Sequence, residues 1–443
     1  MQSNFSQKIA RTFVKYWLAG LISLLTAVFF IAFIKHSTQF SFLKLVFIGF
    51  FLTFASLAIS MLIDSLKAKF WHHLVHYLVI VIMGLILFIF LPVDNFYNGN
   101  YVNFMVGCFI ASLVLYLPFF RNQQNLDFVN YLKHLVINFF VSIVFALIIY
   151  AGFAIFYYIV GNLFAIKITE LVQAYTISLV FTTIGFWIFA YLLPVEFKNI
   201  GFYEILDKIF HVLAVYVLLP FSMIYAITLY IYSLKILFTN VWPSNQVAVF
   251  IGALFVILLV IYFLIQSAES KWFTKLKYYW RFYFAICLPL LIIYFISIGI
   301  RIKQYGYTET RCLSIFLGVV CLFAGLYLVI NKFVRLKYIP LAIGVLLLLL
   351  SFGPWSIFNI TRHSQINRYA EFLTVNQFII DGQVNSNKTI SRFDESYREL
   401  QLKTIYLLNR YQSESIQQFF PNLNLSTNNS QSVNQILNIY LTK

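Results

Sequence analysis

Long apolar stretches follow one another through most of the chain, and only short polar segments separate them. Roughly eleven of them, each about twenty residues long, run from about Tyr16 to about Phe358, and a helix of about that length crosses about 30 Å of hydrocarbon. Lipid offers backbone amides no hydrogen-bond partners, so stretches of this kind form spanning helices. We therefore expect an all-α integral membrane protein, a bundle of about 11 transmembrane helices.

The composition agrees with a membrane location. The chain is 61% hydrophobic and only 10% charged, whereas soluble domains carry about 25% charged residues. Its 51 Phe and 30 Tyr are explained by a coding bias toward such residues, with an aromatic ligand groove as the alternative. The first stretch is too long, and too closely followed by others, for a cleaved signal peptide, so we expect it to remain as an anchor.

Two regions of different composition follow from this pattern. Residues 1–357 are expected to form the transmembrane bundle, and residues 358–443 a mainly helical extramembrane region. In the second region, apolar residues at helical spacing predict a helix that buries Ile366, Tyr369, Phe372 and Leu373. Asp381-Gly382 predicts a turn between two short strands.

A second tail helix is predicted after Ser391 and Asp394, which have the spacing of a capping box. We expect it to bury Phe393, Leu400 and Leu407, among others. A shorter helix should stop at Pro421, a polar mobile stretch should follow, and a last helix should begin near Gln435.

The net charge of +16 is explained by topology. With the amino terminus placed in the cytoplasm, sixteen of the 31 basic residues fall in inner segments and seven in outer loops. The seven are Lys35, Lys44, Lys167, Lys235, Arg301, Lys303 and Arg311. This asymmetry indicates contact with membrane lipids and their anionic headgroups, and not with nucleic acid. Eleven spans would place the carboxyl terminus outside, and a count wrong by one would reverse it.

No catalytic residue, cofactor or metal site is predicted. The four cysteines, Cys108, Cys287, Cys312 and Cys321, match no zinc or redox spacing. His72 and His76 lie one helical turn apart, next to His73, but no third metal ligand is evident. No Asp or Glu lies near the middle of a stretch, which argues against a carboxylate proton relay.

The seventh stretch is the most polar one, and we expect it to be buried within the bundle. Pro220 predicts a kink. Hydroxyl groups fall on two sides of the helix, and a broken helix can line a cavity, although a purely structural kink is the alternative. The candidate cavity-lining residues are Tyr216, Pro220, Tyr225, Thr228 and Tyr232.

One outer loop runs against the charge asymmetry. Arg301, Lys303 and Arg311 lie beside Tyr305 in the segment RIKQYGYTETR. Cationic side chains beside an aromatic ring at the membrane surface can bind a phosphate or carboxylate headgroup, so these four residues are candidate contacts for an anionic ligand. The alternative is that the cations reach the interface from helix ends and pair with Glu309 or with tail carboxylates such as Asp394, Glu395 and Glu399.

Several segments resemble the bacterial domain-of-unknown-function family 4153. They are YVLLPFSMIYAITLYIYSLKI, VWPSNQVAVFIGALFVI, GIRIKQYGYTETR, YIPLAIGVLLLLLSFGPWSIFNITRHSQINR and the tail from FIIDGQV to IQQFF. The resemblance covers roughly residues 130–420. It implies a multi-pass protein of the bacterial inner membrane with no established activity and adds no catalytic residue. Ser244-Asn245 after Pro243 departs from the family pattern, in which we expect a glycine.

These observations favour a non-enzymatic envelope protein with a transporter-like or scaffold role toward an amphiphilic or anionic ligand. A lipid-linked transferase is one alternative, although the bundle offers only Asp94, Glu170 and Glu309 as outer carboxylates for a general base. An envelope sensor with the tail as an outer ligand module is another.

Overall fold

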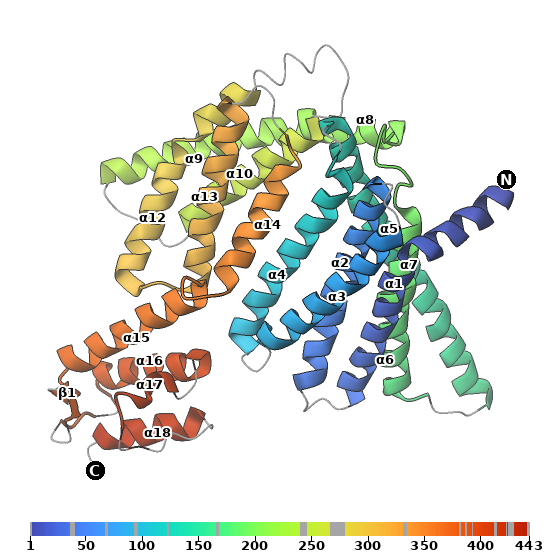
Figure 1. Ribbon diagram of the computed structural model, residues 1–443. Helices are drawn as coiled ribbons and strands as arrows, with labels where there is room; N and C mark the ends of the chain where they lie inside the picture. The colour runs from blue at the N-terminus through green and yellow to red at the C-terminus, as the bar shows by residue number, and fades with distance from the viewer. Residues whose placement is uncertain are drawn as a thin grey trace. The chain divides into compact units, whose positions relative to one another are not determined.

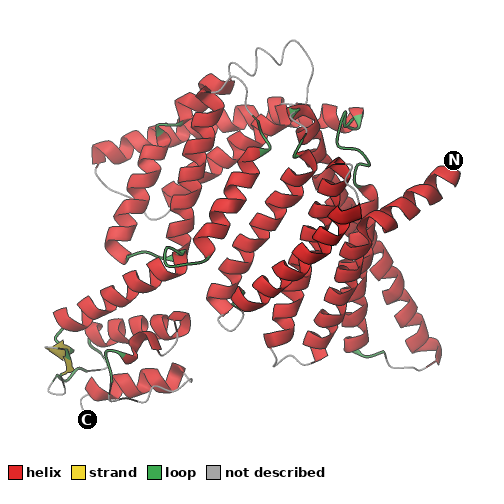
Figure 2. Cartoon of the chain, in the orientation of Figure 1, coloured by secondary structure: helices red, strands yellow, loops and turns green. Residues whose placement is uncertain are grey.

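The computed structural model of the protein is helical almost throughout, with one short pair of strands (Figures 1 and 2). It describes all residues except 1, 36–39, 67–69, 93–95, 122–123, 165–167, 240–245, 266–279, 331–334, 381, 386–387, 392, 412–413, 422, 424–428 and 441–443. The predicted turn residue Asp381 and the Pro243-Ser244-Asn245 loop therefore lie outside the described residues.

Ten described helices are long and apolar enough to cross a membrane, which confirms an all-α multi-pass membrane protein. They correspond to the first ten stretches predicted from the sequence. The eleventh is shorter than expected: α14 spans Tyr338–Ser351, and 14 residues of helix extend only about 21 Å. The chain turns at Gly353, whose positive φ of 87° ends the helix there.

Contacts within the chain divide it into two compact units. The first comprises residues 1–241, 249–292 and 320–348, and the second residues 242–248, 293–319 and 349–443. The predicted division at residue 357 concerns the membrane boundary and stays a prediction.

The first unit contains the amino-terminal spans. Its helices are α1 (Gln2–Lys35), α2 (Phe40–Leu66), α3 (Phe70–Phe90), α4 (Phe96–Tyr116), η1 (Leu117–Phe119), α5 (Asn125–Phe164), α6 (Glu170–Leu179), η2 (Val180–Ile184), α7 (Gly185–Leu192), α8 (Glu204–Val212), η3 (Leu213–Leu218) and α9 (Leu219–Thr239). Most of α10 (Gln246–Ile265) also belongs to it. Here α1 and α7 approach closely, because a Cβ atom on Gly20 would lie only 2.0 Å from the Trp187 ring.

One face of α5 carries polar residues that satisfy the backbone at the end of α7 and in the segment after it. The Asp127 carboxylate accepts a hydrogen bond from the Ile200 amide at 2.9 Å, and the Asn130 side chain donates to the Ile200 carbonyl at 2.8 Å. The Asn138 side chain donates to the Leu192 carbonyl at 2.8 Å. Buried backbone groups outside a helix need such partners, so this polar face is explained by structure.

The second unit contains the ends of two spans and the tail. The spans are α12 (Leu290–Tyr305) and α13 (Glu309–Ile330), of which residues 293–305 and 309–319 belong to this unit. The tail consists of α15 (Ile357–Val375), β1 (Ile379–Ile380), β2 (Gln383–Val384), α16 (Glu395–Tyr411), α17 (Glu414–Gln417) and α18 (Asn429–Tyr440). The strands form the predicted antiparallel hairpin, which pairs Ile379 with Val384.

The tail has its own hydrophobic core, in which Tyr369, Leu373, Leu400 and Leu407 are buried. Two predictions for the tail were wrong. Phe393 precedes α16 and is 99% exposed, because the helix begins two residues later at Glu395. The last helix begins at Asn429 and not near Gln435, because Val433 joins the apolar face that enters the core.

Candidate functional site

The turn between α12 and α13 is only three residues long and has a backbone that requires glycine. Gly306 has a φ of +73°, and its amide donates to the Ile302 carbonyl at 2.8 Å, which closes the end of α12. A Cβ atom at this position would lie 2.7 Å from the Arg368 Cδ atom. The turn therefore depends on glycine for both its conformation and its close contact with α15.

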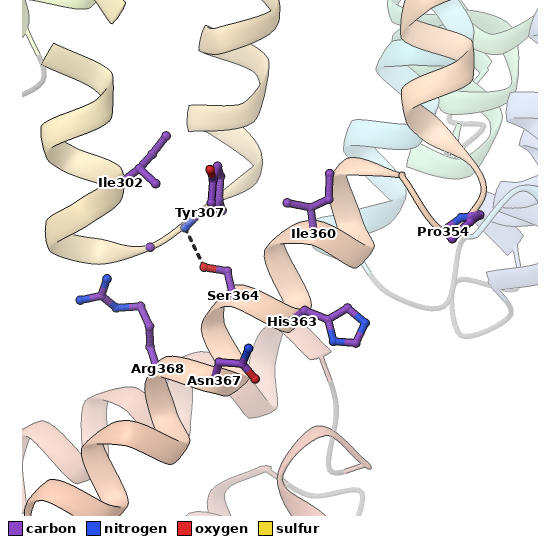
Figure 3. A pocket seen from close by; sticks show the side chains of 9 residues that line it. Ile302, Tyr307, Pro354, Ile360, His363, Ser364, Asn367 and Arg368 are labelled. Atoms are coloured by element: carbon purple, nitrogen blue, oxygen red, sulfur yellow. Dashed lines mark hydrogen bonds between the residues drawn. The ribbon is translucent and has the colours of Figure 1, made fainter. Parts of the chain in front are cut away.

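Three residues on one side of α15 hold this turn by hydrogen bonds to its backbone. The Ser364 hydroxyl accepts from the Tyr307 amide at 3.0 Å (Figure 3). The Gln365 side chain donates to the carbonyls of Tyr305 and Tyr307 at 3.1 and 2.7 Å.

The third residue of this face is Arg368, whose guanidinium donates to the carbonyls of Lys303 and Gln304 at 3.1 and 2.5 Å. These carbonyls form the end of α12, where a helix leaves carbonyls without intrahelical partners and carries partial negative charge. We call Ser364, Gln365 and Arg368 the α15 clamp.

A buried carboxylate lies directly after the turn. Glu309 is 1% exposed and forms an ion pair with Arg410 of α16, with an Nη2–Oε2 distance of 2.6 Å and an Nε–Oε1 distance of 3.1 Å. The Thr361 and Tyr411 hydroxyls donate to the same carboxylate at 3.3 and 3.4 Å. Burial, and then the nearby Glu309 charge, raise the pKa of Tyr411, so its phenol stays protonated as a donor.

This ion pair bears on the alternative in which the cations of the basic loop pair with Glu309 or with tail carboxylates. Glu309 pairs with a tail arginine, and not with the loop cations. Two of the tail carboxylates also have local partners: Asp394 accepts from the Ser391 amide at 2.8 Å, as the capping-box spacing predicted, and Glu399 pairs with Lys403 at 3.0 Å.

Three of the four candidate anion-contact residues lie together. The guanidinium carbon of Arg311 is 5.4 Å from the centre of the Tyr305 ring, and that of Arg301 is 6.0 Å from it. Arg311 also donates to the Gly306 carbonyl at 2.8 Å, and Arg301 to the Gln304 side chain at 3.0 Å. Lys303 has an exposed side chain in the last turn of α12.

A groove of about 570 Å³ lies beside the turn. One wall is formed by α15 and the other by the end of α12 (Figure 3). Its lining includes Ile302, Tyr307, Pro354, Ile360, His363, Asn367 and Arg368. The groove thus combines apolar side chains with hydrogen-bonding ones.

The two segments that meet at this turn both lie in the part of the chain that matches a known family. The description of that family is Domain of unknown function (DUF4153), and its match covers residues 19–382. The chain belongs to the DUF4153 family. No curated protein and no solved structure matches the chain. The match includes the turn and the clamp, whereas Arg410 and Tyr411 lie beyond it.

The seventh span of this DUF4153 member is covered on one side only. The buried side chains of its α9 part are Ser222, Ala226, Leu229, Ser233 and Ile236, which recur at helical spacing. Among the candidate cavity-lining residues, Tyr216 is 71% exposed and Pro220 and Thr228 are exposed, whereas Tyr225 and Tyr232 are half-buried. The expectation that the bundle encloses this helix was therefore wrong, because the buried side chains lie on one face of α9 while Tyr216 and Thr228 are exposed.

The hydroxyls that do face neighbours bind backbone carbonyls. Tyr225 donates to Phe250 of α10 at 2.9 Å, and Tyr230 donates to Ile286, one turn before the helix break at Leu288-Pro289. Next to Pro220 the helix widens to a π-helix, η3, which accommodates the missing amide. A lining role for these residues stays a prediction.

The histidine and cysteine candidates are accounted for locally. The His76 ring is buried and lies 3.1 Å from the Ser56 hydroxyl, while His72 and His73 are exposed. Among the described residues there is no group of three or more His, Cys, Asp or Glu that could hold a metal. The four cysteines are free thiols.

Sequence reasoning missed the α15 clamp and the partner of Glu309. Ser364, Gln365 and Arg368 did lie in a segment of the family resemblance, and their spacing places them on one helical face. Nothing in the sequence connected that face with a turn about 60 residues earlier.

Proposed function

We propose that this protein is a non-enzymatic protein of the bacterial inner membrane with a transporter-like or scaffold role. In this proposal Arg301, Lys303, Tyr305 and Arg311 contact an anionic headgroup of an amphiphilic ligand. The supporting observation is that two guanidinium groups lie over one tyrosine ring at the ends of two spans, while Glu309, the carboxylate at the start of α13, is neutralised by Arg410. Cationic side chains at the ends of spans lie at the level of the lipid headgroups and can attract their phosphates.

The ion pair also bears on the enzyme alternative. A general base must reach a substrate proton, whereas Glu309 is 1% exposed and accepts hydrogen bonds from three residues. This arrangement favours a structural role for the Glu309 carboxylate over a role as the general base of a transferase.

A sensor role is the second candidate, and one observation favours it. The tail has its own hydrophobic core and is joined to α13 by the Glu309–Arg410 ion pair, so a ligand bound to the tail could bias that contact.

We place the tail outside the cytoplasm on the basis of charge asymmetry. A reporter that is active only outside the cytoplasm, fused after Lys443, should be active; activity of a cytoplasmic reporter instead would reverse the orientation.

The ligand proposal is tested by lipid retention. In the triple variant Arg301→Gln, Lys303→Gln and Arg311→Gln, native mass spectrometry of the purified chain should detect fewer bound anionic lipids. The matched control removes three exposed cations elsewhere, with Lys198→Gln, Lys235→Gln and Arg398→Gln. Equal retention by the two triple variants would show that the loop cations have no special role.

A further inference from the structure

The groove beside the α12–α13 turn lies at the level where lipid headgroups are found. Tyr305 ends one candidate span and Glu309 begins the next, so the turn between them is at a membrane–water boundary. Tyr307 and Ile302, which line the groove, come from this turn and from the last turn of α12. A ligand in the groove therefore has a polar part in water and an apolar part near hydrocarbon.

The groove offers polar side chains that form no hydrogen bond within the described part of the chain. The side chains of Tyr307, His363 and Asn367 are exposed, and within the described residues none of them forms a hydrogen bond. His363 and Asn367 are one helical turn apart on α15 and thus share a face (Figure 3). Phenol, imidazole and amide groups can all donate to a phosphate oxygen.

The charge around the groove is positive. Arg368 uses two of the five N–H groups of a guanidinium for the carbonyls of α12, which leaves others for a ligand. Arg311 lies nearby, bound to the Gly306 carbonyl, and the Glu309 charge is neutralised by Arg410. An anionic group is favoured at such a surface over a zwitterionic one.

The apolar part of the lining completes the description of the ligand. Ile302 and Ile360 approach from opposite walls, and Pro354 lies at one end of the groove (Figure 3). These side chains can bury the first methylene groups of an acyl chain, which stabilises the bound lipid. A free inorganic anion would leave them without a partner.

We infer that this groove binds the headgroup of an anionic phospholipid from the surrounding membrane. Its polar headgroup lies along the polar part of the lining, where Tyr307, His363, Asn367 and Arg368 offer donors at separate points, and its glycerol and first chain carbons lie against Ile302 and Ile360. This inference rests on the proposed function and deepens it, because it names the ligand class and adds residues of α15 to those of the basic loop.

The test uses the purified full chain in detergent and a short-chain phosphatidylglycerol as the probe. The double variant His363→Ala and Asn367→Ala should bind this lipid about tenfold more weakly, since hydrogen bonds to a charged group are lost. Tyr307→Phe should weaken binding by a smaller factor while keeping the ring. Arg362→Ala and Glu371→Ala, two exposed positions on the same helix, form the control and should bind as the parent does.

Competition identifies the ligand class. Short-chain phosphatidylcholine and inorganic phosphate should each compete poorly with the anionic lipid. Equal competition by phosphatidylcholine would overturn the preference for an anion, and equal competition by phosphate would overturn a lipid ligand. Unchanged binding in Tyr307→Phe, together with unchanged binding in the double variant, would overturn the groove as the site.

The outcomes also separate this inference from the proposed function. If the triple variant of the basic loop loses lipid while the groove variants retain it, the proposed function stands and the groove inference fails. If the groove variants lose lipid and the triple variant does not, the groove is the site and the three loop cations are not part of it.

Discussion

Glu309 at the start of α13 and Arg410 in α16 are joined by two charge-assisted hydrogen bonds across 101 residues of sequence. The carboxylate is 1% exposed and the arginine side chain 14% exposed. Because both charges are removed from water, each depends on the other. The tail is thus joined to a spanning helix by a contact that neither segment could satisfy alone.

Removing one member of this pair should destabilise the protein strongly. Arg410→Met would leave the Glu309 carboxylate buried without a counter-charge, and a broken buried pair costs about 3–5 kcal/mol. The free energy of unfolding of the purified chain in detergent measures the effect. Arg398→Met, an exposed arginine on the same helix, should change it by less than about 1 kcal/mol.

The double variant Glu309→Gln and Arg410→Met gives the control for charge. It removes the buried carboxylate as well, so it should recover most of the stability lost in Arg410→Met. A double variant as unstable as the single one would mean that Arg410 acts through packing alone.

Substituting the glycine of the turn should weaken the α15 clamp. In Gly306→Ala the new methyl group meets both a positive φ of 73° and the Arg368 side chain at 2.7 Å. The backbone strain alone costs about 1–2 kcal/mol, and the contact must add to it by displacing Arg368. Thermal unfolding of the purified chain is the measurement.

Gly382→Ala is the matched control, because this glycine also has a positive φ, of 78°, but has no atom within 4 Å of its would-be Cβ. It should show the strain without the collision, and so a smaller loss. Equal losses at the two positions would remove the close contact as a cause.

The sequence predicted the spans well because a membrane helix can be recognised from a single continuous stretch of apolar residues. Hydrophobic length identifies a span without knowledge of its neighbours, so the ten long spans and the hairpin around Gly382 were found. The length of α14 was overestimated because apolar residues continue past Ser351, whereas the helix ends before the positive φ of Gly353.

The site was predicted only in part, because its contacts join distant segments. Arg301, Tyr305 and Arg311 are close in sequence, and the structure brings them together. The partner of Glu309 could not be chosen from the sequence, since several arginines were equally eligible and only the packing of α16 decides between them. The clamp residues were hidden for the same reason.

High pH should destabilise the tail through a buried tyrosine. Burial raises the pKa of Tyr440 from 10 to about 12, and its hydroxyl donates to the Phe378 carbonyl at 2.9 Å. Between these values the unfolded chain ionises this group while the folded chain keeps it neutral, so the unfolded state binds fewer protons and stability falls. The contribution is fully present below about pH 10 and is lost by about pH 12, with a magnitude of order 2 kcal/mol.

Tyr440→Phe isolates this effect. It should lower stability by about 1 kcal/mol at neutral pH, because the hydrogen bond to Phe378 is lost. Between about pH 10 and 12 it should lose less stability than the parent, as followed by denaturant unfolding at each pH. Parallel pH profiles for parent and variant would show that another group controls this range.

The one-sided burial of the seventh span predicts that substitutions at two of its small polar residues change stability by different amounts. Ser222 is 1% exposed and accepts a hydrogen bond from Tyr283 at 3.3 Å, so Ser222→Leu must displace neighbouring helices, at a cost of about 1–3 kcal/mol. Thr228 is exposed and bonds only within its own helix, so Thr228→Leu should be nearly neutral in lipid. Thermal stability in detergent compares the two, and a larger loss for Thr228→Leu would mean that a partner covers the exposed face, as the cavity-lining prediction requires.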